Sequence, residues 1–132
     1  MWVDADAVMM AYPEELLDRE CDFGCHVVEW WKYPGRESWT GKREYLGGTV
    51  YVGNTRMGRT MVKHWIAYLK AHPKLTDQQA MGEIVKMTDR GKVKVWDMPA
   101  SYCQIFDSMA AAGEPVIEHT QASRRLKAEV GR

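Results

Sequence analysis

The 132-residue chain is long enough to form one domain with a buried core. Its 18 basic and 18 acidic residues balance each other, and hydrophobic residues make up 45% of the chain. This balance creates no overall field that would attract nucleic acid or anionic lipid, so neither is expected as a partner. No apolar run approaches the roughly 18 residues of a membrane span, and the first residues do not resemble a signal peptide. We therefore expect a cytoplasmic protein that does not enter a membrane.

The cysteine content also favours the cytoplasm, where thiols are kept reduced. Cys21, Cys25 and Cys103 are an odd number, which argues against a disulfide framework and for reduced thiols. Cys21 and Cys25 lie close to His26, but a zinc site usually has a second pair of ligands at a recognisable distance, and the sequence offers none. We expect buried thiols and no zinc site.

In the N-terminal half, apolar residues 1–3 predict the end of a strand. Pro13 and the acidic residues after it predict a short helix that ends near Arg19. The β-branched and aromatic content of residues 23–30 and 45–52 predicts two more strands, with a polar, aromatic loop between them. The aromatic side chains of that loop could stack on a sugar ring or fold over the core; they are Trp30, Trp31, Tyr33 and Trp39.

In the C-terminal half, residues 55–71 predict a helix, because apolar residues recur there at steps of three and four. The apolar positions are Met57, Met61, Val62, Trp65, Tyr68 and Leu69. Thr76 and Gln79 have the spacing of a capping box, which predicts a second helix that ends near Asp89. Short strands are then expected at residues 93–96, 102–106 and 116–118, and a closing helix at residues 121–130. Strands interleaved with helices predict an α/β fold, with a mixed sheet flanked by helices, in a single domain over residues 1–132.

The Asp4-Ala5-Asp6 triplet follows the first apolar strand. If the extended backbone continues, both carboxylates project to the same side. Such a pair suits magnesium or manganese, which complete their shells with water and phosphate oxygens. The triplet also fits a turn whose aspartates bond to their own backbone. The sequence leaves both interpretations open.

Five segments occur in an order that resembles the glycogenin-like branch of type-A nucleotide-sugar glycosyltransferases and its bacterial and phage relatives. They are residues 4–8 (DADAV), residues 47–51 (GGTVY), Trp65, residues 76–80 (TDQQA) and residues 115–119 (PVIEH). The resemblance extends from residue 2 to about residue 127. It implies a partial nucleotide-diphospho-sugar transferase fold, covering the part of the family's domain from the DxD motif onward.

The resemblance also implies functional roles. In the family, the aspartates of the first motif and a late histidine bind a manganese or magnesium ion, which corresponds here to Asp4, Asp6 and His119. The family's Asp-Gln pair near the transferred sugar corresponds to Asp77 and Gln78. For Asp77, the first turn of a capped helix is an alternative reason for an acidic residue.

Two further sets of residues complete the expected site. The family's small residues that let the sugars approach the backbone correspond to Gly47 and Gly48, for which a strand bulge is the alternative. The family's basic residues beside the diphosphate would correspond to Arg124, Arg125 or Lys127. A solvated helix face explains these three residues equally well.

The function implied by the resemblance is metal-dependent transfer of a hexosyl group from a nucleoside diphosphate sugar to a hydroxyl of a sugar or protein acceptor. A non-catalytic remnant or binding module of the same fold stays open, and so does a metal-dependent hydrolase that uses the same aspartates. In the family a nucleotide-binding unit precedes the DxD motif, whereas only residues 1–3 precede it here, so no residue is assigned to the base. The exposed edge of this short strand predicts self-association as a homodimer.

Overall fold

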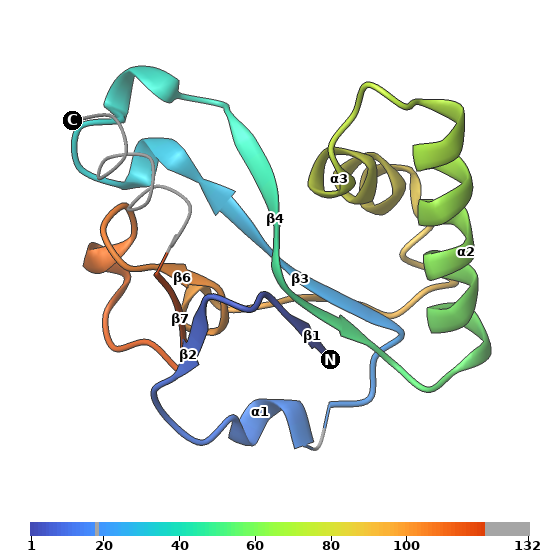
Figure 1. Cartoon of the computed structure of the whole chain (residues 1–132), viewed down its shortest axis with the longest axis horizontal. Helices are drawn as coiled ribbons and strands as arrows, with labels where there is room; N and C mark the ends of the chain where they lie inside the picture. The colour runs from blue at the N-terminus through green and yellow to red at the C-terminus, as the bar shows by residue number, and fades with distance from the viewer. Residues whose placement is uncertain (18, 121–132) are drawn as a thin grey trace.

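A computed structural model describes residues 1–17 and 19–120 of the chain (Figure 1). Two sheets form its centre. The four-stranded sheet has the order β1 (Trp2–Val3), β4 (Arg43–Val52), β3 (Phe23–Glu29) and β5 (Val95–Asp97). The three-stranded sheet has the order β2 (Ala7–Met9), β7 (Ile117–His119) and β6 (Gln104–Ile105). Both sheets contain parallel and antiparallel pairs, so the expected α/β fold with mixed sheets is confirmed.

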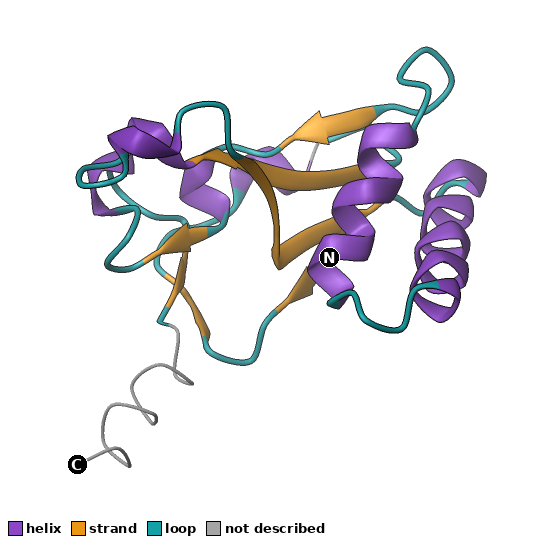
Figure 2. Ribbon diagram, turned by 90° about the horizontal axis from the view of Figure 1, so that it is seen from above, coloured by secondary structure: helices purple, strands orange, loops and turns teal. Residues whose placement is uncertain are grey.

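Three α-helices accompany the sheets in the described residues. They are α1 (Glu14–Leu17), α2 (Arg56–Ala71) and α3 (Asp77–Met87). Short 3₁₀ turns occur at Trp30–Lys32, Glu37–Trp39, Ala100–Tyr102 and Ala110–Ala112. Figure 2 shows that α2 and α3 lie together at one end of the molecule. No helix in the described part of the chain is long and apolar enough to span a membrane.

Both long helices begin where their side chains can cap them. The Thr55 hydroxyl accepts a hydrogen bond from the Gly58 N–H at the start of α2. Thr76 and Gln79 form the complete capping box that the sequence predicts, each side chain bonding to the backbone of the other residue. The helices pack on the four-stranded sheet around a core made of Phe23, Cys25, Val50, Met61, Met81, Val85 and Val93.

A second core lies under the loop between β3 and β4. It contains Val28, Trp30, Leu46, Cys103, Ile105 and Met109. The Arg36 guanidinium lies 4.1 Å from the ring centroid of buried Trp30 and 5.1 Å from that of Trp39. For Trp30 and Tyr33 the structure favours folding over the core, whereas Trp39 is 39% exposed and both interpretations stay open for it.

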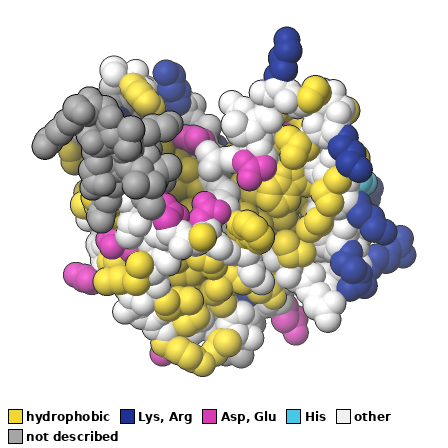
Figure 3. Space-filling model, in the orientation of Figure 1, with side chains coloured by type: hydrophobic (Ala, Val, Ile, Leu, Met, Phe, Trp, Pro, Cys, Tyr) yellow, Lys and Arg dark blue, Asp and Glu magenta, His cyan; other side chains and the backbone are white. Residues whose placement is uncertain are grey.

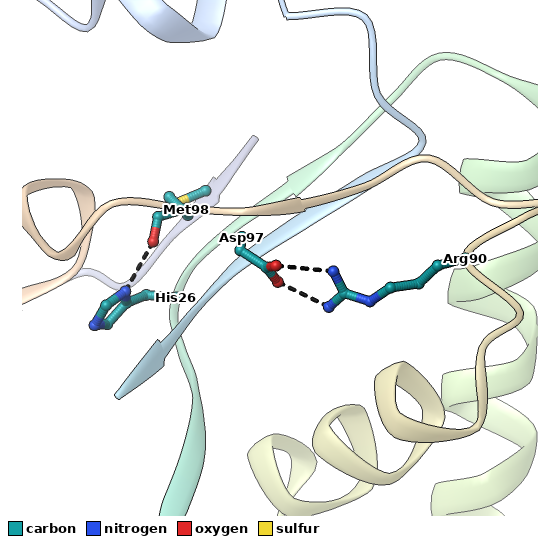
Figure 4. Close-up of polar contacts among 4 residues, drawn as sticks. All are labelled: His26, Arg90, Asp97 and Met98. Carbon is teal, nitrogen blue, oxygen red and sulfur yellow. Dashed lines mark hydrogen bonds and ion pairs between the residues drawn. The ribbon is translucent and has the colours of Figure 1, made fainter. Parts of the chain in front are cut away.

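The cysteines are buried and unpaired in the described residues, as expected. Burial raises the pKa of Cys25 to about 12 and that of Cys103 to about 11, so both thiols stay protonated near neutral pH. Beside Cys25, a nitrogen of the half-buried His26 ring lies 2.8 Å from the Met98 carbonyl oxygen, and Arg90 forms a two-pronged ion pair with Asp97 (Figure 4). The His26 contact holds the segment after β5 against β3, and the Arg90 ion pair links the turn before β5 to its last residue.

Candidate metal centre

The Asp4-Ala5-Asp6 triplet connects the two sheets. β1 ends at Val3 and β2 begins at Ala7, and between them the Ala7 N–H donates a 3.1 Å hydrogen bond to the Asp4 carbonyl. The triplet is therefore a turn, and the continued strand that would have aligned the carboxylates is absent from this segment. The two aspartates nevertheless come together, because a third segment of the chain meets this turn.

That third segment is β7, which ends in His119. The antiparallel pairing of β2 with β7 sets Ala7 opposite His119, and both the N–H and the hydroxyl of Thr120 donate to the Asp6 carbonyl. As a result, ligand atoms of Asp4, Asp6 and His119 all lie within 4.8 Å of one another. The structure brings together the three residues that the resemblance implies as metal ligands.

The His119 ring is buried and fixed by one neighbour. Its Nε2 lies 2.9 Å from the Thr49 hydroxyl, which leaves Nδ1 available to a ligand. Burial lowers the pKa of His119, whereas the charges of Asp4 and Asp6 act in the opposite direction. The net lowering favours the neutral imidazole, which is the form that binds metal ions.

A bulge in β4 carries the residues that touch this ring. Cys25 of β3 pairs with Val50, but the next residue, His26, pairs with Leu46, so Gly47, Gly48 and Thr49 are extra residues in β4. Bulges often occur beside functional sites, because they redirect side chains and backbone groups.

Gly48 lies at the point where this bulge meets the acidic turn. Its carbonyl accepts a 2.9 Å hydrogen bond from the Asp4 N–H. A Cβ at Gly48 would lie only 2.7 Å from Cε1 of His119. Glycine is therefore required for the close approach of the ring, and its place in the bulge agrees with the structural alternative for this residue.

Gln78 holds the other glycine of the bulge. Its side-chain oxygen accepts a 2.9 Å hydrogen bond from the Gly47 N–H, and its amide nitrogen donates a 2.6 Å bond to Glu44. The second oxygen of Glu44 accepts a 2.6 Å bond from the Trp30 indole. The orientation of the Gln78 amide is fixed by these partners.

Asp77 has a clear structural role at the start of α3. Its side chain accepts a hydrogen bond from the Gln78 N–H, and its carbonyl accepts one from the Trp65 indole. The expected helix at residues 121–130 lies outside the described residues, as do the basic residues proposed to contact the diphosphate. Those residues are Arg124, Arg125 and Lys127.

Glu44 and Thr49 were missed by the sequence analysis. Thr49 belongs to the GGTVY segment that carries the resemblance, but no local signal pairs it with His119, which lies 70 residues away in the chain. Glu44 carries no such signal, because its partners Trp30 and Gln78 are 14 and 34 residues away in the chain.

The donor set fits a divalent cation of the magnesium or manganese type. Carboxylate oxygens suit these ions, and an imidazole whose second nitrogen is held by a hydroxyl is a common arrangement around protein metals. Asp4 is exposed and Asp6 half-buried, so water or phosphate oxygens can reach the same ion. Figure 3 shows acidic side chains gathered near the middle of this face, with apolar side chains below them.

Comparison with known proteins bears on this arrangement. The sequence matches the nucleotide-diphospho-sugar transferase family over residues 1–125, which include the acidic turn, the bulge, the start of α3 and His119. Searches of curated proteins and of solved structures found no match. Because the family match covers nearly the whole chain, the protein belongs to the nucleotide-diphospho-sugar transferase family.

Proposed function

We propose that this protein is a metal-dependent glycosyltransferase of the glycogenin-like branch, which transfers a hexosyl group from a nucleoside diphosphate sugar to a hydroxyl acceptor. The observation that carries the proposal is the meeting of Asp4, Asp6 and His119 within 4.8 Å. In the transfer, the bond from the anomeric carbon to the diphosphate oxygen breaks and a bond to the acceptor oxygen forms. The acceptor hydroxyl gives its proton to the departing diphosphate or to water.

In this proposal Asp4, Asp6 and Nδ1 of His119 hold manganese or magnesium. The cation would neutralise the leaving diphosphate as a Lewis acid. With its proton on Nε2, donated to the Thr49 hydroxyl 2.9 Å away, His119 would present the lone pair of Nδ1 to the ion. Arg124, Arg125 or Lys127 would share the charge of the diphosphate.

The sugar would lie against the bulge. The lack of side chains at Gly47 and Gly48 lets it approach the backbone, and Asp77 and Gln78 would contact the sugar or the acceptor. Glu44 acts through Gln78 as a positioning residue, because it holds the amide that binds the Gly47 N–H. Precise placement of this kind contributes several kcal/mol to barrier reduction.

A thermal shift experiment tests the metal site. Manganese at a hundredfold excess over its dissociation constant should add about 2.7 kcal/mol to the free energy of unfolding, which raises Tm by several degrees. The Asp4→Asn/Asp6→Asn variant should lose this response. A control variant, Glu20→Gln/Glu114→Gln, removes two exposed acidic groups elsewhere and should keep it. An unchanged response in the aspartate variant would show that the proposed site is wrong.

We also propose that the cytoplasmic protein, a single domain over residues 1–132, self-associates as a homodimer. In the described residues β1 is the edge of its sheet, and the first 17 residues of the chain carry seven large exposed apolar side chains. These side chains belong to Met1, Trp2, Val8, Met9, Met10, Tyr12 and Leu17. Proteins rarely leave such an edge and such a surface open. Sedimentation should detect a dimer that Trp2→Glu weakens, and a monomer at millimolar concentration would contradict the proposal.

A further inference from the structure

Helix α2 presents a row of basic side chains to solvent. Arg56, Arg59, Lys63 and Lys70 are all exposed, and Ile66, which lies between the last two in the chain, is 50% exposed. At 3.6 residues per turn, the four basic residues fall within an arc of about 60° and extend along about 21 Å of the helix. We call these four residues the basic stripe. Figure 3 shows basic side chains along the edge of the molecule at which Figure 1 places α2.

The basic stripe lies opposite the side of α2 that packs on the core. Met61 is buried in that core, and Met57 and Trp65 pack against it. These three residues project about 170° away from the centre of the basic stripe. Packing within the described domain therefore does not account for the residue types of the stripe.

No carboxylate pairs with the basic stripe in the part of the chain that the structure describes. Helix α2 contains no acidic residue, and Arg59 donates a 3.0 Å hydrogen bond to the neutral side chain of Asn54. An exposed helix usually carries both signs of charge, because opposite charges three or four residues apart stabilise it. Basic residues elsewhere in the described chain do form ion pairs; they are Arg19, Lys32, Arg43, Lys86, Arg90 and Lys92.

The charges of α2 also oppose its own dipole. Arg56 is the first residue of the helix and Arg59 follows one turn later, at the end where the helix dipole disfavours cations. Helix α3 has the stabilising arrangement, with Asp77 in its first turn and Lys86 in its last. Like charges three or four residues apart, such as those of Arg56 and Arg59, destabilise α2 further. A partner that brings negative charge to the stripe would relieve both effects.

The spacing of the stripe fits a helix as this partner. Together with Ile66, the basic stripe advances at alternating steps of three and four residues, which is the spacing by which two helices pack side by side. Thr60 and Ala67 flank the row, and their small side chains leave room for a second helix to approach. The Thr60 hydroxyl donates to the Arg56 carbonyl, so its hydrogen bond is made within α2.

We propose that the basic stripe and Ile66 bind an acidic amphipathic helix of another protein, with carboxylates at the same alternating spacing and an apolar residue opposite Ile66. Phosphates of a nucleic acid would pair with the cations but leave Ile66 in water, and attachment to a membrane needs a larger apolar surface than one isoleucine. The inference goes beyond the proposed transferase function, because it uses none of the residues of the candidate metal centre.

The test measures the affinity of the full chain for a fluorescent helical peptide of about 20 residues at low ionic strength. The glutamates of this ordered peptide follow the alternating spacing around a central leucine, and a scrambled peptide of the same composition spreads them around the helix. The ordered peptide should bind roughly tenfold more tightly than the scrambled one. Arg59→Gln/Lys63→Gln should weaken its binding roughly fivefold to tenfold. Lys32→Gln/Lys42→Gln, which removes two exposed basic groups elsewhere, should keep it.

A charge swap tests the pairing directly. Arg59→Glu/Lys63→Glu should lose the ordered peptide and bind instead a counterpart in which lysines replace the glutamates. Both α2 variants should fold, which urea denaturation checks, because they relieve the repulsion between like charges in α2. Ile66→Asn should weaken binding of the ordered peptide roughly fivefold, because the buried apolar contact is lost.

Three results would overturn the inference. The first is that the ordered peptide fails to bind at millimolar concentration or binds no more tightly than the scrambled one. The second is an equal loss of affinity in the two glutamine variants. The third is tighter binding of a DNA duplex of about 20 base pairs, or of vesicles that contain phosphatidylserine, with no effect of Ile66→Asn, since this would assign the stripe to a phosphate-bearing partner. Manganese affinity should be the same in all these variants, so the proposed metal site stands or fails separately.

Discussion

The helical layer and the sheet junction are built on different principles. The helical layer, made of α2, α3 and the core beneath them, is held mainly by buried apolar side chains such as Met61, Met81 and Val85. The sheet junction consists of the Asp4–Asp6 turn, the Gly47–Thr49 bulge and His119, and it is held by hydrogen bonds between segments far apart in the chain. Apolar contacts dominate the first region, and polar contacts dominate the second.

Because the two regions are held by different interactions, we expect one to determine stability and the other to serve ligand binding. Burial of apolar area supplies most of the free energy of folding, so the helical layer should determine how firmly the domain folds. The junction gathers the Asp4 and Asp6 carboxylates and the His119 ring within 4.8 Å of one another, an arrangement that serves ligand binding. Substitutions in the two regions should therefore change different measurements.

The largest effect is expected in the helical layer. Met81 is 1% exposed, and Met81→Ala should lower the free energy of unfolding by roughly 2–5 kcal/mol, because it leaves a cavity in the core. Met87→Ala is a matched control in the same helix, since Met87 is 61% exposed, and it should change stability by about 0.5 kcal/mol or less. Urea denaturation measures both values.

Manganese binding by the folded Met81→Ala variant tests whether the two regions act independently. Its dissociation constant for manganese should match that of the unchanged protein at a urea concentration where both are folded. A large loss of affinity in this variant would show that the helical layer and the sheet junction are coupled.

Within the sheet junction, substitutions of the two bulge glycines should change manganese affinity by different amounts. Gly48→Ala should weaken manganese binding roughly 10–100-fold, because its methyl group would displace the His119 ring that it would meet at 2.7 Å. Gly47→Ala should leave manganese binding unchanged, because its Cβ would meet Gln78 at an ordinary contact distance of 3.5 Å. Calorimetric titration measures both affinities, and equal losses in the two variants would contradict the proposed role of Gly48.

The same contrast explains what the sequence could predict. The capping box of Thr76 and Gln79 and the apolar periodicity of α2 are local signals, so α3 begins and α2 ends where the sequence predicts. The short strand β2 was not predicted, because its three residues form a strand only by pairing with β7, more than a hundred residues later. Local sequence carries no information about such a pairing.

The candidate site shows the same limit. The aspartate triplet could be selected from its residue types, but His119 was assigned only through the family resemblance, because nothing near it in the sequence indicates a metal ligand. The β2–β7 register that sets Ala7 opposite His119 became visible only in the structure. The Glu44 contact with Gln78 was missed for the same reason, since it depends on how α3 packs on β4.

The smallest expected effect concerns His26, which lies on β3 beside the bulge (Figure 4). Burial lowers the pKa of His26, although the hydrogen bond to Met98 acts in the opposite direction. In the unfolded chain a histidine titrates near pH 6.5. Between the two pKa values the unfolded state binds more protons than the folded state, so the free energy of unfolding rises with pH in this window. Acidification below about pH 6.5 should therefore destabilise the protein.

His26→Gln isolates this contribution, because glutamine keeps a donor for the Met98 carbonyl and removes the titrating ring. Measured by urea denaturation from about pH 5.5 to about pH 7.5 without metal, the variant should lose less stability on acidification than the unchanged protein. Some dependence on pH should remain, since burial also lowers the pKa of His119 in the sheet junction, and His26→Gln/His119→Gln should flatten the profile further. An unchanged slope in the single variant would show that His26 takes up its proton as readily in the folded state as in the unfolded state, and that the β3 side of the bulge is open to water.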